Sequence, residues 1–97
     1  MATLFVLQGR EKGKRYDLRS DKLTLGRDHT SSVQVSDDEI SRRHAEIRRD
    51  EQGYLLVDLG SSNGTFVNGE RVERVALQDG DKLAIAEHEF VVRIAQK

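Results

Sequence analysis

The 97-residue chain contains no cysteine, no proline and no tryptophan. The absence of cysteine excludes disulfide bonds and thiolate metal sites. Without proline, the tight turns have to be made by glycine, asparagine, aspartate and serine. The sequence therefore predicts a domain that depends on an apolar core and on these turn residues.

Long apolar runs and a strong excess of one charge are also missing. No run approaches the roughly 20 apolar residues that span a bilayer, and no charged-then-apolar leader with a cleavage site is visible. The formal net charge of −1 is unlike the basic balance of nucleic-acid-binding modules. We therefore expect no membrane segment and no nucleic-acid partner. The lack of cysteine is compatible with a cytoplasmic location, which we also expect.

What the chain does contain is enough for one core. Its hydrophobic fraction is 36%, and a chain of this length is too short for a second stable core. No linker, repeat or low-complexity segment divides it. We expect residues 1–97 to form one domain, monomeric in isolation.

The apolar pattern alternates in short segments, separated by turn signals about every eight to ten residues, and no segment has a helical period. This pattern is typical of an all-β fold, an antiparallel β-sandwich of about eleven short strands. The expected strands are residues 3–8, 14–18, 23–25, 33–35, 44–49, 54–59, 65–67, 70–72, 74–76, 82–86 and 89–94. The expected core consists of Phe5, Leu7, Leu23, Leu25, Val35, Ile47, Leu55, Val57, Leu59, Phe66, Leu83, Ile85, Phe90, Val92 and Ile94.

The segment from Asp58 to Gly69 carries two turn signals in close succession. Residues 60–64 form a small polar loop of glycine, serine and asparagine, which tolerate positive φ or bond their own backbone. Asn68-Gly69 is a strong signal for a two-residue hairpin turn. The short strand between these turns holds the polar loop on a rigid scaffold, where binding groups are often placed.

Two further motifs precede this loop. Gly26-Arg27 ends an expected strand with a cation, and residues 41–44, Ser-Arg-Arg-His, follow an acidic run at 37–39. Together with the Ser-Asn-Gly-Thr sequence at 62–65, these motifs have the order and spacing of the forkhead-associated domain. The chain resembles this phosphothreonine-binding family over essentially its whole length.

The resemblance implies a phosphate site. A phosphoryl group brings about −1.5 to −2 charges and three strong acceptor oxygens, so it needs a guanidinium and several hydroxyl or amide donors. By the resemblance, the phosphate-binding residues are Arg27, Ser41, Ser62 and Arg42 through its amide. Asn63 and the Arg42 side chain are expected to bind the main chain of the peptide.

Other positions are expected to support or tune this site. Gly26, His44, Gly64 and Thr65 match scaffold positions of the family. Arg43 is either a second phosphate-binding cation or a solvated charge. Glu39, with the two aspartates before it, either disfavours acidic and tolerates basic residues three positions after the phosphothreonine, or only keeps the loop solvated.

The sequence thus predicts a signalling module that recognises phosphothreonine in proteins phosphorylated by Ser/Thr kinases. It implies no cofactor and no metal, since His29, His44 and His88 lack ligand spacing. The alternative is a scaffold of the same fold that binds proteins without phosphate or self-associates. A hydrolytic triad of Ser41, His44 and Asp58 is rejected because no nucleophile elbow or oxyanion loop surrounds Ser41. We therefore expect no enzyme activity.

Overall fold

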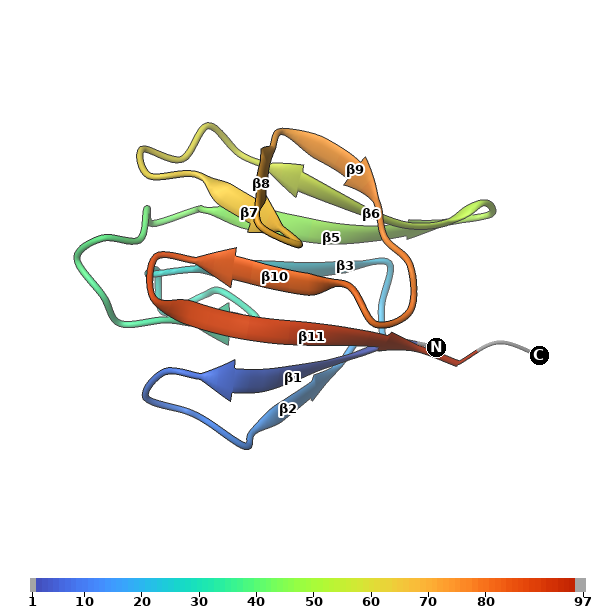
Figure 1. Cartoon of the computed structure of the whole chain (residues 1–97), viewed down its shortest axis with the longest axis horizontal. Helices are drawn as coiled ribbons and strands as arrows, with labels where there is room; N and C mark the ends of the chain where they lie inside the picture. The colour runs from blue at the N-terminus through green and yellow to red at the C-terminus, as the bar shows by residue number, and fades with distance from the viewer. Residues whose placement is uncertain (1, 96–97) are drawn as a thin grey trace.

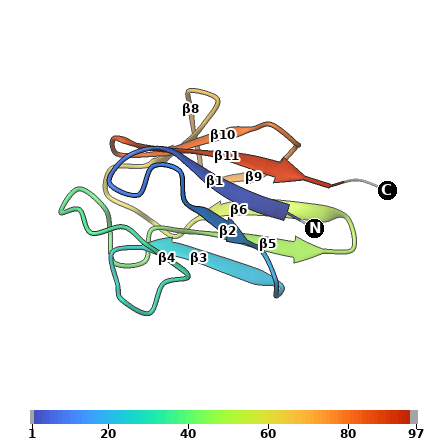
Figure 2. The same cartoon turned by 90° about the horizontal axis from the view of Figure 1, so that it is seen from below.

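The computed structural model describes residues 2–95, which form eleven strands and no helix. Two sheets pack face to face (Figures 1 and 2). The six-stranded sheet has the order β2-β1-β11-β10-β7-β8, and the five-stranded sheet has the order β4-β3-β5-β6-β9. The strands are β1 Ala2–Gln8, β2 Arg15–Asp17, β3 Lys22–Gly26, β4 Val33–Gln34, β5 Ala45–Asp50, β6 Gly53–Asp58, β7 Thr65–Val67, β8 Glu70–Val72, β9 Arg74–Ala76, β10 Lys82–Ile85 and β11 His88–Ile94.

The expected β-sandwich is confirmed, and each expected strand is present within about one residue at its ends. One pairing differs from the antiparallel prediction, because β3 and β4 are parallel, with Leu25 opposite Val33. The loop between them turns the chain back beside β3. Hydroxyls close this loop, since Thr24 Oγ1 accepts a hydrogen bond from the backbone N–H of Ser32 at 2.8 Å.

The core lies between the sheets, and the sequence predicted only part of it. Leu23, Leu25, Val35, Ile47, Leu83, Ile85, Phe90 and Val92 are buried as expected. Ile94 is partly buried and packs against the core. The prediction was wrong for Phe5, Leu7, Leu55, Val57, Leu59 and Phe66, which are partly or well exposed.

The physical reason is that several strands carry apolar side chains on both faces, so alternation does not show which face is inside. In β1 the buried residues are Leu4 and Val6 instead of their neighbours. In β6 and β7 they are Leu56 and Val67. In these strands, the face opposite to the predicted one therefore points into the core.

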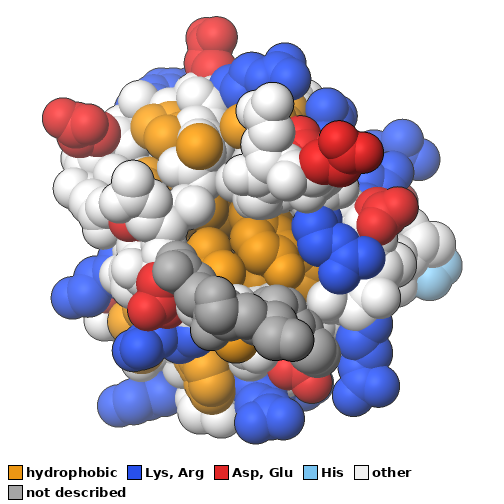
Figure 3. Space-filling model, turned by 90° about the vertical axis from the view of Figure 1, so that its right-hand side faces the viewer, with side chains coloured by type: hydrophobic (Ala, Val, Ile, Leu, Met, Phe, Trp, Pro, Cys, Tyr) orange, Lys and Arg blue, Asp and Glu red, His pale blue; other side chains and the backbone are white. Residues whose placement is uncertain are grey.

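The connections β1–β2, β3–β4, β4–β5, β6–β7 and β10–β11 gather at one end of the sandwich, on the left in Figure 1. The opposite end, seen in Figure 3, shows hydrophobic side chains in the centre of a ring of charged ones. Within residues 2–95 there is no helix that could cross a membrane. All the predicted site motifs lie at the loop end.

Candidate functional site

The β3–β4 and β4–β5 loops are joined where Arg27 leaves β3. Its side-chain Nε donates to the carbonyl oxygen of Ile40 at 3.0 Å, and its backbone N–H donates to that of Ser41 at 3.1 Å. A Cβ on Gly26 would lie 2.1 Å from the carbonyl oxygen of Arg42. Only glycine allows this approach, so Gly26 determines how closely Arg27 lies to the following loop.

A second contact joins the β4–β5 loop to the polar loop between β6 and β7. The hydroxyl oxygen of Ser41 accepts a hydrogen bond from the backbone N–H of Ser62 at 3.2 Å. The side-chain amide of Asn63 donates to the carbonyl oxygen of Glu39 at 2.8 Å. The structure thus brings Arg27, Ser41, Ser62 and Asn63 together around one loop.

His44 is buried beneath these loops, with an exposed fraction of 0%. Its Nδ1 accepts a hydrogen bond from the backbone N–H of Ser41 at 3.2 Å. Its Nε2 therefore carries the proton and donates to the carbonyl oxygen of Gly64 at 2.8 Å. Both ring nitrogens are occupied by backbone groups, so the histidine links the two loops from below.

Asp58, at the end of β6, organises the polar loop. Its Oδ1 accepts the backbone N–H groups of Gly60 and Ser61, each at 2.8 Å. Its Oδ2 accepts the hydroxyls of Ser61 and Thr65, each at 2.7 Å. Ser61 Oγ in turn accepts the backbone N–H of Gly64 at 3.0 Å.

This network changes the acidity of Asp58. Burial raises its pKa, but hydrogen bonds from Ser61, Thr65 and Gly60 together outweigh burial and leave the pKa below its usual value of 3.8. Sequence reasoning considered Asp58 only for a catalytic triad and missed this role. An aspartate at a strand end, followed by Gly-Ser-Ser, was the available signal, because aspartate commonly bonds backbone amides two or three residues ahead.

The rejected triad is also absent from the geometry. Asp58 bonds its own loop, and the nitrogens of His44 bond Ser41 N–H and the Gly64 carbonyl. Neither nitrogen is directed by a hydrogen bond to the Ser41 hydroxyl. These residues therefore build loops, with no base presented to the serine.

Several donors at this end form no hydrogen bond among residues 2–95. They are the hydroxyl proton of Ser62, the Arg42 backbone N–H and the terminal guanidinium nitrogens of Arg27. Ser41 keeps its hydroxyl proton because its recorded bond is an accepted one. The carboxamide oxygen of Asn63 is also unoccupied within the described chain, since only its nitrogen is bonded.

The site is rich in cations that lack counterions. Among residues 2–95, six arginines form no ion pair, namely 10, 27, 42, 43, 71 and 74, whereas arginines 15, 19, 48, 49 and 93 each contact a carboxylate. Of the six, Arg27 and Arg42 lie at the loops that hold the free donors. Such an arrangement attracts an anion at short range.

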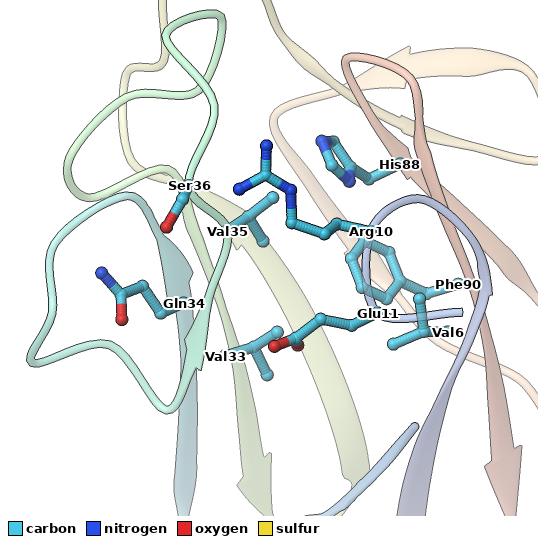
Figure 4. Close-up of a pocket in the computed structure, with 9 residues that line it drawn as sticks. All are labelled: Val6, Arg10, Glu11, Val33, Gln34, Val35, Ser36, His88 and Phe90. Atoms are coloured by element: carbon cyan, nitrogen blue, oxygen red, sulfur yellow. The ribbon is translucent and has the colours of Figure 1, made fainter. Parts of the chain in front are cut away.

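The surface near these residues is hollowed in several places. Arg27 and Arg42 line one hollow together with Asp28, His29 and Gln34. Arg43 lines another, beside Thr24 and Glu46 of the five-stranded sheet, and its charge adds to the hydrogen bonds that lower the pKa of Asp28, the residue after Arg27. A more apolar pocket lies between the β1–β2 loop and β4, with Val6, Val33, Val35 and Phe90 inside and Arg10 and His88 at its edge (Figure 4).

Comparison with known proteins gives a consistent result. The family model of the FHA domain matches residues 23–86. FhaA of Mycobacterium tuberculosis is 42% identical over 82 residues, which are 84% of this chain and 16% of that protein. The oxoglutarate dehydrogenase inhibitor of Corynebacterium jeikeium is 39% identical over 90 residues, 93% of this chain and 62% of that protein. The chain thus spans less than two thirds of the length of these relatives.

Solved structures agree in fold over nearly the entire chain. A domain from a study of phosphothreonine-dependent FHA domain interactions has a TM-score of 0.89 and 38% identity, and the match covers 99% of this chain and 98% of that one. The FhaA FHA domain, complexed with the intracellular domain of Rv3910, has a TM-score of 0.87 and 40% identity, covering 96% and 100%.

Proposed function

We propose that this chain, which belongs to the FHA domain family, is a signalling module that binds phosphothreonine in proteins phosphorylated by Ser/Thr kinases. The observation that carries the proposal is the convergence of free donors on two linked loops. Arg27 supplies a guanidinium, Ser41 and Ser62 supply hydroxyls, and Arg42 supplies a backbone N–H. Their number and kind suit the three oxygens and the double charge of a phosphoryl group.

The peptide main chain is assigned to Asn63. Its nitrogen donates to the Glu39 carbonyl, and its carboxamide oxygen remains as an acceptor for a backbone N–H of the ligand. The exposed Arg42 side chain is assigned to the same main chain. Gly26, His44, Gly64 and Thr65 act through the loops they position and contact no ligand.

The proposal extends to the setting of the protein. We assign the role of a non-catalytic adaptor to residues 1–97 as one monomeric domain in the cytoplasm, where kinases supply phosphothreonine. It uses no metal or cofactor and binds neither nucleic acid nor membrane. Support comes from relatives named as regulators, such as the oxoglutarate dehydrogenase inhibitor and the glycogen accumulation regulator GarA.

The test is a calorimetric titration with one peptide in three forms: phosphothreonine, phosphoserine and unmodified threonine. Charge-assisted hydrogen bonds contribute roughly 1.5–3 kcal/mol each, so the phosphothreonine form should bind in the micromolar range and the unmodified form not measurably. The phosphoserine form should bind more weakly, since burial of the threonine methyl contributes about 0.8 kcal/mol. Equal binding of the phosphorylated and unmodified forms would instead favour a phosphate-independent scaffold.

A further inference from the structure

Asn63 and Gly64 contact two segments that carry charges of opposite sign. The Asn63 side chain bonds the backbone of Glu39, in the acidic 37–39 segment. A Cβ on Gly64 would lie 2.8 Å from Nε of Arg71 and 3.1 Å from its Cζ. The guanidinium of Arg71 therefore packs against the α-carbon of Gly64, where the glycine leaves it room.

Arg71 reaches this place from β8, outside every motif discussed so far. It lies opposite Phe66 in the β7–β8 pair, and Gly64 stands immediately before β7. It is exposed, and among residues 2–95 its side chain forms no ion pair and no hydrogen bond. Its charge is thus held at the edge of the polar loop without a partner.

The acidic side of the loop is only partly neutralised. Asp37 is occupied, because its Oδ2 accepts from Nε2 of His88 at 2.9 Å and its Oδ1 accepts the backbone N–H of Glu39 at 2.9 Å. Asp38 and Glu39 are exposed and form no ion pair among the described residues. An extended peptide held at Asn63 would therefore lie near both the acidic 37–39 segment and the guanidinium of Arg71.

We propose that Arg71 is a specificity-determining residue, which selects an anionic side chain in the ligand within three residues of the phosphothreonine. Glu39 acts at a different ligand position and disfavours an anion there. This inference rests on the proposed function, because it assumes that Asn63 holds the peptide main chain. The anion recognised by Arg71 is a carboxylate or a second phosphoryl group, which offer the same oxygen acceptors.

The test uses a phosphothreonine peptide with alanine at the three positions on each side. Each position is replaced in turn by Asp, phosphoserine or Lys, and affinities are measured for the wild type, Arg71→Gln, Arg71→Glu and Glu39→Gln. Gln keeps part of the stem that packs on Gly64 while removing the charge. Arg19→Ala, an exposed arginine in the β2–β3 loop, is the matched control for net charge.

The wild type should prefer Asp over Ala at one position by about fivefold, the upper range for an exposed ion pair. A larger effect of phosphoserine than of Asp would identify a second phosphoryl group as the natural anion. Arg71→Gln should remove this preference and bind the all-alanine peptide as the wild type does, and Arg71→Glu should prefer Lys there. Glu39→Gln should raise the affinity for peptides with Asp at another position. Arg19→Ala should change neither of these two preferences.

Two results would overturn the inference while leaving the proposed function intact. One is an unchanged preference profile in Arg71→Gln and Arg71→Glu. The other is an equal loss of affinity for all phosphopeptides in Arg71→Gln, which would make Arg71 a phosphate-binding or loop-supporting residue. If the wild type bound no phosphothreonine peptide, the proposed function itself would fail, a result that the all-alanine peptide shows separately.

Discussion

The hydroxyl oxygen of Ser41 lies 3.2 Å from the backbone nitrogen of Ser62, from which it accepts a hydrogen bond. This bond joins two loops that are separated by a complete β-hairpin in the sequence. It uses a lone pair of the hydroxyl and leaves the proton available. Ser41 can therefore fix the position of Ser62 and donate to a bound anion at the same time.

Replacing Ser41 by Ala should weaken phosphothreonine binding by about 10- to 100-fold, because one charge-assisted bond and the link to Ser62 are lost. Isothermal titration calorimetry measures this. Ser36→Ala is the control, an exposed serine of the β4–β5 loop whose hydroxyl forms no recorded bond. An equal effect of the two variants, or none, would show that Ser41 plays no specific part.

Asp58→Asn should destabilise the domain at neutral pH by about 1–2 kcal/mol, since hydrogen bonds to a carboxylate are lost. The native pKa of Asp58 is lowered, so its contribution is complete above the pKa of the unfolded chain, near 4, and disappears as pH falls through the lower native value. Denaturant unfolding should therefore show the stabilities of the two proteins converging as the pH falls below about 4. Asp50→Asn, at a turn aspartate with one backbone bond, should have little effect. If the unfolding free energies of wild type and Asp58→Asn stayed equally far apart at every pH, this account would be contradicted.

Gly26→Ala should destabilise the fold by about 3 kcal/mol, because the added methyl group meets a backbone carbonyl that cannot move alone. The distance of 2.1 Å to the Arg42 oxygen forces the β3 end and the β4–β5 loop apart. Binding should weaken as well. Gly13→Ala, where no atom lies within 4 Å, should cost only about 1 kcal/mol from its positive φ. Thermal melts compare the stabilities of the two variants. Equal losses of stability would mean that the contact at Gly26 is unimportant.

His44→Ala should cost roughly 3–5 kcal/mol, since it leaves a cavity and two buried backbone groups without partners. The groups are the Ser41 N–H and the Gly64 carbonyl. In two-dimensional NMR spectra, amide shifts should change in both loops. His29→Ala removes a side chain that is 87% exposed and should leave stability and spectra almost unchanged. If His44→Ala did not lower the stability, the bridging role would be refuted.

Affinity for a phosphothreonine peptide should fall as pH drops below about 6, where the phosphoryl group loses its second charge. The fold should not change in this range. Backbone and hydroxyl donors lower the pKa of Asp28 and Asp58, and the Glu39 amide and His88 lower that of Asp37, so these carboxylates stay charged. Fluorescence anisotropy between pH 7.5 and 5, with a melting curve at each pH, tests this, and a constant affinity would contradict a role for the doubly charged form.

The sequence predicted the strands well because turns and alternation are local properties. Asn68-Gly69 and the other glycine-containing turns marked half of the connections, and all eleven strands are present. It failed where the answer depends on packing between sheets. Phe5 and Phe66 are as apolar as their neighbours, and only the assembled sandwich shows that Leu4 and Val67 are inside.

The same distinction applies to the candidate site. Short motifs placed Arg27, Ser41 and Asn63 in loops that the structure brings together. The motifs could not show that Arg71 reaches Gly64 from β8, because this contact depends on side-chain direction and strand register. The role of Asp58 had a local signal, which the sequence reasoning overlooked. The Asn63–Glu39 bond was likewise invisible, since it involves a backbone carbonyl.

The most direct measurement compares wild type and Arg27→Ala, each with a phosphothreonine peptide and its unmodified form. Wild type should favour the phosphorylated form by at least about 100-fold, as several charge-assisted bonds imply. Arg27→Ala should lose most of this preference, with only a small fall in melting temperature from the lost Nε bond to the Ile40 carbonyl and no change in binding of the unmodified peptide. Retention of the full preference in Arg27→Ala would contradict the claim that this arginine and the two linked loops form the phosphate site.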